Sequence, residues 1–136
     1  MSIEIRDIDR RIWEEELAQF VPQKIFDAHT HIYLSEHDLT RHDDNLPETA
    51  DEITQQISAI DRKALDRIYA LLFPGREIHN VLFGWVFDHV DFDAINRFVA
   101  EQAAQDPLSA PFMLTPPSFS QQHLAEQVDT YGFLGL

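Results

Sequence analysis

The chain has 136 residues, of which 44% are hydrophobic and 25% are charged, values that fit one folded domain and exclude a disordered chain. Asp and Glu number 24 against 10 Lys and Arg, a net charge of −14 that argues against a nucleic-acid or anionic-membrane partner. No Cys is present, which excludes a disulfide scaffold, a zinc-thiolate site and a Cys nucleophile. The acidic first 21 residues do not resemble a signal peptide and no run of ~18 apolar residues occurs, so we expect a cytoplasmic protein.

The first third of the chain predicts a helix, a strand and a long loop. Apolar residues recur with helical spacing over residues 6–20, and Pro22 ends this pattern. Residues 24–33 are mostly apolar and favour a strand. The polar stretch 34–47 is typical of a loop.

The middle of the chain predicts a helical region followed by a second strand. Thr49 and Glu52 form a capping box ahead of apolar residues with helical spacing, among them Ile60, and Asp61 can cap a second helix within this region. The run 78–87 is rich in β-branched and aromatic residues, which favours a strand buried on both faces.

The last third predicts two helices, each followed by a short strand. The strands are residues 111–115 and 133–136, and Gly132 suits the residue that ends the second helix. The capping residues are Asp91 or Asp93 for the first helix and Ser118 or Ser120 for the second.

Strands that alternate with helices predict parallel βαβ units in an α/β protein. Four strands with three connecting helices make half of a (β/α)8 TIM barrel, whose usual size is ~250 residues. We therefore expect the N-terminal half of such a barrel as a single partial segment, 1–136. Residues 1–23 form its N-terminal helix and lead-in, and residues 24–136 form about four parallel strands with their helices.

The strongest chemical signal is Asp27-Ala28-His29-Thr30-His31 at the end of the first predicted strand. Residues two apart on a strand share a face, so His29 and His31 can converge on one divalent cation, and Asp27 is expected on that same face. Chance would produce this Asp-x-His-x-His pattern in roughly 0.04 of chains of such length and composition. We therefore predict that His29 and His31 are metal ligands.

Residues 25–32, Ile-Phe-Asp-Ala-His-Thr-His-Ile, resemble the first-strand motif of the amidohydrolase superfamily, in particular its amidohydrolase-2 branch, which includes metal-dependent decarboxylases. Residues 72–77 and 83–85 are similar to segments before and within the second strand of this branch. Residues 132–136 are similar to the start of its fourth strand, so the resemblance covers roughly residues 8–136.

The resemblance implies a (β/α)8 barrel with a divalent metal, Zn²⁺ above all, held in part by His29 and His31. It further implies hydrolysis of a C–N or C–O bond of a small molecule, or a decarboxylation, by a metal-activated water. The family's other ligands, a strand-5 His and a strand-8 Asp that also acts as general base, have no counterpart in these 136 residues. We therefore expect no turnover from this chain alone.

Other candidates for substrate contact or metal support lie in loops that follow strands, where barrel active sites form. The loop after the first strand holds His37, Arg41 and His42, and His89 follows the second strand. Arg41 could pair with a substrate carboxylate.

Two alternatives remain open. One is another barrel enzyme with an early His-x-His, such as a uronate isomerase or a TIM-barrel DNase, although the −14 charge disfavours DNA. The other is a non-catalytic, truncated half-barrel whose exposed strand edges lead to self-association as a homo-oligomer.

Overall fold

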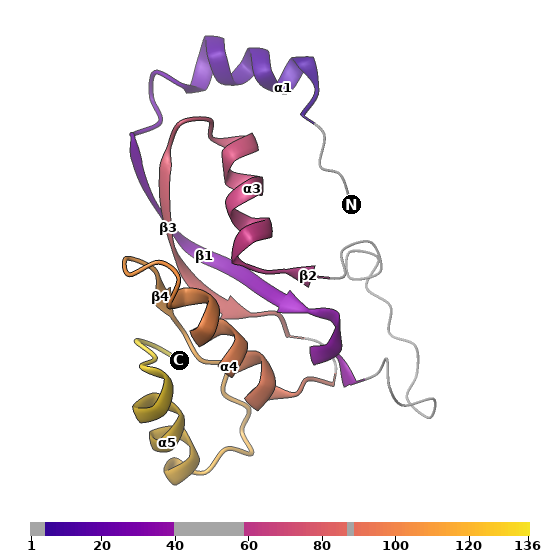
Figure 1. Cartoon of the computed structure of the whole chain (residues 1–136), viewed down its shortest axis with the longest axis vertical. Helices are drawn as coiled ribbons and strands as arrows, with labels where there is room; N and C mark the ends of the chain where they lie inside the picture. The colour runs from indigo at the N-terminus through magenta and orange to yellow at the C-terminus, as the bar shows by residue number, and fades with distance from the viewer. Residues whose placement is uncertain (1–4, 40–58, 87–88) are drawn as a thin grey trace.

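A computed structural model describes residues 5–39, 59–86 and 89–136 and shows an α/β fold built on a mixed sheet (Figure 1). The strands are β1 (Lys24–Leu34), β2 (Ala59–Ile60), β3 (Glu77–Gly84) and β4 (Ala110–Pro111), in the order β2-β1-β3-β4. The helices are α1 (Asp7–Ile12), α3 (Arg62–Leu72), α4 (Phe92–Ala103) and α5 (Gln121–Tyr131). A π-helical turn, η1 (Trp13–Leu17), continues α1, and a 3-10 turn, η2 (Ser35–His37), follows β1.

Three strands run parallel and lie side by side in chain order. β1 pairs with β3 over seven register positions, and β3 pairs with β4 at Val81 and Leu82. Beyond β4, a single parallel bridge joins Phe112 to Gly135. The strands expected at 24–33 and 78–87 are therefore found as β1 and β3, the second of which ends at Gly84. The strand expected at 111–115 is found only as the two-residue β4 and the bridge at Phe112, and the strand expected at 133–136 is reduced to this bridge.

The expectation of a wholly parallel sheet is wrong. β2 pairs antiparallel with the end of β1, through Tyr33 with Ile60 and Leu34 with Ala59. Ile60, predicted on a helix, is extended because α3 begins only after its N-cap, Asp61. Within the described residues the sheet is open and does not close into a barrel.

Local sequence signals place the helix ends correctly. The Asp61 carboxylate accepts the Ala64 amide at 2.7 Å, and that of Asp91 accepts the Ala94 amide at 3.0 Å. Ser120 caps α5, which ends at Gly132 with the left-handed φ of 68° that glycine adopts without strain. The Thr49–Glu52 capping box lies outside the described residues.

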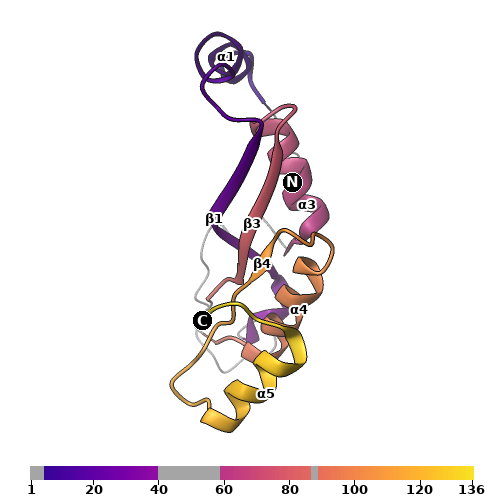
Figure 2. The ribbon, with the colours of Figure 1, turned by 90° about the vertical axis from the view of Figure 1, so that its left-hand side faces the viewer.

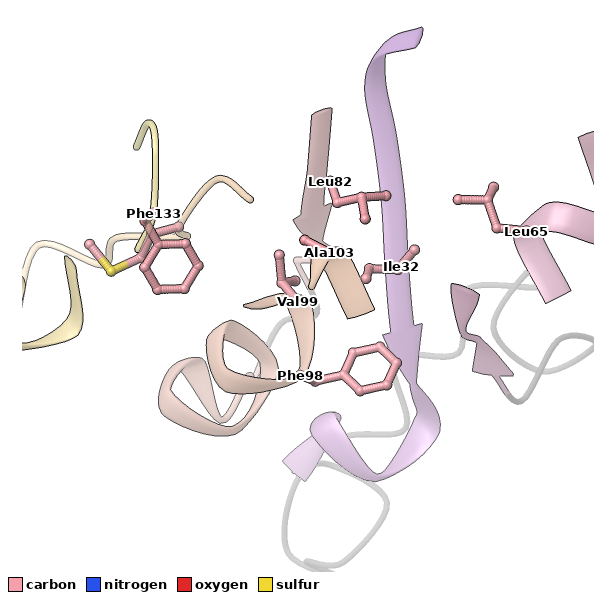
Figure 3. Packing of buried hydrophobic residues seen from close by; sticks show 8 residues of the cluster. Ile32, Leu65, Leu82, Phe98, Val99, Ala103 and Phe133 are labelled. Carbon is pink, nitrogen blue, oxygen red and sulfur yellow. The ribbon is translucent and has the colours of Figure 1, made fainter. Parts of the chain in front are cut away.

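Two helices, α3 and α4, cover one face of β1 and β3, and the opposite face carries no helix in the described residues (Figure 2). The core lies between these helices and the sheet, and Figure 3 shows the packing of most of its members. The buried cluster consists of Ile32, Leu65, Leu82, Phe98, Val99, Ala103, Met113 and Phe133. Leu82 and Ile32, the central strand residues, are fully buried.

The N-terminal helix is held against the end of α3 by one arginine. Arg76 donates hydrogen bonds to the carbonyl oxygens of Ala18 and Val21 and lies over the Trp13 ring, 5.1 Å from its centroid. Trp13 also contacts Phe73 edge-to-face at 5.9 Å. Among the helices of the described residues, none has the length and apolar character needed to span a membrane.

Candidate metal site

A β-bulge interrupts β1 within the Asp-x-His-x-His motif. Asp27 pairs with Asn80 and Thr30 with Leu82, so β1 advances three residues where β3 advances two. The extra residue explains why Ala28 and His29 are both exposed although they are neighbours on a strand. The bulge shifts the alternation of faces by one residue.

The shift separates Asp27 from the two histidines, contrary to the expectation that all three share a face. Asp27 and Thr30 both reach the hydroxyl of Tyr69 on α3, at 2.7 and 3.1 Å, so both face the helices. His29 and His31 flank Thr30 and therefore face the open side. The prediction was wrong because it assumed a regular strand over residues 27–31, in which residues two apart share a face, and the bulge breaks that regularity.

The two imidazoles lie close together on the open face. Their ring centroids are 5.0 Å apart, with the planes at 77°. Two imidazoles that share one tetrahedral ion at ~2.1 Å each have centroids about 5 Å apart. The spacing therefore suits a shared divalent cation.

The hydrogen bond of His31 leaves one ring nitrogen available. Its Nδ1 lies 2.9 Å from the carbonyl oxygen of Gly84, which can only accept, so Nδ1 carries the proton. In the neutral ring Nε2 then has the free lone pair that a metal requires. Metal-binding histidines very commonly donate their other N–H to a backbone carbonyl in this way.

Aromatic rings surround the pair. The centroid of the Phe83 ring lies 4.7 Å from that of His29 and 4.4 Å from that of His31. The Trp85 centroid lies 4.8 Å from that of His31, and all three pairs are near edge-to-face. These rings restrict the orientations of both imidazoles and provide an apolar wall beside them. Trp85 therefore packs directly against the site.

Asp27 joins a partly buried polar cluster on the helix side. Its Oδ2 accepts the Tyr69 hydroxyl and its Oδ1 accepts the His29 amide at 3.1 Å. Burial by itself raises the pKa of Asp27, but the hydrogen bonds from Tyr69 and His29 outweigh it, so the pKa lies below its usual value. Burial, together with the bond to Asp27, raises the pKa of Tyr69 to about 12, so this hydroxyl stays a donor at neutral pH.

His37 takes no part in this group. It is buried in η2, where its Nδ1 accepts the Leu34 amide at 3.1 Å and its ring lies 5.2 Å from Phe98. Burial lowers the pKa of His37. This environment is that of a structural histidine that joins η2 to α4.

Of the remaining loop candidates, only His89 lies within the described residues, where no contact joins it to the pair. His89 is exposed, and its carbonyl oxygen accepts the Leu39 amide at 2.8 Å. Arg41 and His42 lie outside the described residues.

Sequence reasoning missed the role of Tyr69, which links Asp27, Thr30 and Asn80. Tyr69 lies 39 residues from Thr30 and 42 residues from Asp27 in the chain, and its helical spacing is that of a core residue. No local signal could therefore have identified it.

A second titratable cluster lies at the start of β3. The Nδ1 of His79 is 2.8 Å from Asp106 and its Nε2 is 3.0 Å from Glu77, while Arg62 donates to Asp106 at 3.3 Å. The hydrogen bond to Asp106, followed by that to Glu77, raises the pKa of His79. Both ring nitrogens face carboxylates, so this histidine is a structural ion-pair partner.

The described residues bring two candidate ligands together and not a full coordination set. Within 5–39, 59–86 and 89–136, no group of three or more His, Cys, Asp or Glu side chains is arranged to hold a metal ion. Comparison of the chain with known protein families, with curated proteins and with solved structures gives no match.

Proposed function

We propose that His29 and His31 bind a divalent metal ion, with Zn²⁺ the first candidate, and that this pair is part of the metal centre of an amidohydrolase-2-type enzyme. When bound, such an ion would activate water toward a C–N or C–O bond of a small molecule or support a decarboxylation. One observation carries the proposal. The Nδ1–H of His31 is taken up by the Gly84 carbonyl, which leaves Nε2 free beside the second imidazole.

The wider architecture supports a (β/α)8-type barrel as the setting. β1, β3 and β4 are parallel neighbours in chain order, and α3 and α4 lie on one face of them. The histidines occupy the opposite face toward the carboxyl end of β1, the position at which such barrels place their chemistry. The short antiparallel β2 is an addition at that end of β1.

The side chains of the site have distinct expected roles. His29 and His31 hold the ion, and Phe83 with Trp85 excludes water from one side of it. Within residues 5–39, 59–86 and 89–136 the site has two candidate protein ligands, fewer than the three that catalytic zinc sites use together with water. We expect these two ligands by themselves to bind metal and to give no turnover.

Calorimetric titration with Zn²⁺ tests the proposal. We expect about one ion per chain, with affinity at least about 100-fold weaker in His29→Ala and in His31→Ala. His123→Ala is the matched control. His123 lies on α5 and is paired with Asp93 of α4, so its replacement should leave Zn²⁺ binding unchanged. Equal affinity in the wild type and both site variants would contradict the proposal.

Self-association through the exposed strand edges stays a prediction from the sequence. Phe26 is 54% exposed and lies on β1 before the bulge. Gel filtration with and without Zn²⁺ measures whether two copies combine their histidine pairs around one ion.

A further inference from the structure

The bulge in β1 decides which face of the sheet the two histidines occupy. Asp27, before the bulge, and Thr30, after it, both face α3. In a regular strand that kept Asp27 on this side, His29 and His31 would point toward the helices as well, because residues i, i+2 and i+4 share a face. The extra residue therefore brings the imidazoles to the open face.

The carboxylate of Asp27 holds the bulge in place. A bulge leaves its extra residue outside the regular ladder, so the amide needs another acceptor. Asp27 provides it, since its Oδ1 lies 3.1 Å from the amide nitrogen of His29, two residues ahead. Asp side chains stabilise local turns through this same bond to the backbone two residues on.

Tyr69 in turn fixes the direction of the Asp27 carboxylate. The hydroxyl lies 2.7 Å from Asn80 Nδ2, which can only donate, so the oxygen of Tyr69 accepts there. Its own proton goes to Asp27 Oδ2, also at 2.7 Å, because a carboxylate can only accept. These donors and acceptors make one internally consistent set of hydrogen bonds. The set includes Asn80, which is fully buried.

We infer that Tyr69, acting through Asp27, is a positioning residue for the His29–His31 pair, because it maintains the bulge that brings both imidazoles to the open face. The consequence for metal affinity rests on the proposed function, whereas the consequence for the bulge does not. Tyr69 faces the helix side of the strand and so acts without contacting the ion.

Zinc titration of Tyr69→Phe and Asp27→Ala tests the inference, at a temperature at which circular dichroism shows every variant folded. We expect Zn²⁺ affinity to fall roughly 10- to 100-fold in each, the range found when partners of metal ligands are removed. Tyr131→Phe is the matched control, because it removes the same hydroxyl from α5 and leaves the cluster intact. The double variant should bind no more weakly than Asp27→Ala, since both changes break one chain of contacts.

Amide hydrogen exchange followed by NMR gives a second readout that needs no metal. The His29 amide should exchange at least about 10-fold faster in Tyr69→Phe, while amides of β3 keep their protection. A wild type that binds no Zn²⁺ overturns the proposed function, and the His29 exchange rate then decides the positioning role. If the wild type binds Zn²⁺ and Tyr69→Phe binds it with unchanged affinity, the inference is overturned and the proposed function stands. Additive losses of affinity in the double variant would overturn the inference in the same way.

Discussion

The two faces of the sheet formed by β1 and β3 differ in how far their side chains are buried and hydrogen-bonded. On the helix side, Ile32 and Leu82 are fully buried and the polar groups of Asp27, Tyr69 and Asn80 satisfy one another. On the open side, His31 has a carbonyl partner on one nitrogen only. One face is therefore closed by packing and hydrogen bonding, and the other presents groups that can bind a ligand.

The histidines of this protein make the same contrast in chemical terms. His79 lies between Asp106 and Glu77, and both its nitrogens face carboxylates. Within the described residues, His31 is hydrogen-bonded to the Gly84 carbonyl and packed against aromatic rings, with no carboxylate partner. Carboxylates on both nitrogens make a histidine structural, whereas a carbonyl acceptor on one nitrogen fixes the orientation of the ring and leaves the other nitrogen for a metal.

The largest effect on stability is expected from a cavity on the closed face. Leu82→Ala should lower the free energy of unfolding by about 2–5 kcal/mol, because Leu82 is fully buried in the core cluster. Phe26→Ala, on the open face at 54% exposure, should change it by less than about 1 kcal/mol. Urea denaturation of both variants measures the difference, and equal losses would remove the distinction between the faces.

A smaller loss is expected where the closed face has no room for an added methyl group. A Cβ on Gly84 would lie 2.6 Å from Cδ1 and 2.7 Å from Cγ1 of Ile95, a fully buried residue of α4. Gly84→Ala should therefore destabilise the protein by about 1–3 kcal/mol, because Ile95 must move. Gly75→Ser serves as a contrast, since nothing lies within 4 Å there and any cost comes from its positive φ of 74°. A Gly84→Ala variant as stable as the wild type would show that α4 adjusts freely.

The smallest expected effect on stability is confined to acid pH and comes from Asp106. Burial raises the pKa of Asp106, but hydrogen bonds from Ser109, His79 and Leu108 outweigh it and lower the pKa to about 2. The folded-state pKa lies below the unfolded value of about 3.8, so the stabilisation is complete above that pH and is lost as the pH falls toward 2. Thermal unfolding of wild type and Asp106→Asn between pH 5 and 2 should show curves that converge as the pH falls. Parallel curves would mean that Asp106 does not contribute to the acid transition.

Sequence patterns predicted the elements well where the signal was local. Asp61, Asp91 and Ser120 cap the helices that follow them, and residues 24–34 and 77–84 form the paired central strands. Side-chain capping and apolar runs act over a few residues, so they can be read without tertiary structure. The two-residue β2 carries no such signal, since its position depends on pairing with a distant strand.

The sequence by itself determined that His29 and His31 lie two residues apart near the end of a strand, and hence on one face. Only the tertiary structure decided which face that is, because a bulge between Asp27 and Thr30 reverses the alternation. The bulge depends on the hydroxyl of Tyr69, 42 residues from Asp27, and on the pairing with β3. Strand periodicity is a local property, but the register of a strand is set by its neighbours.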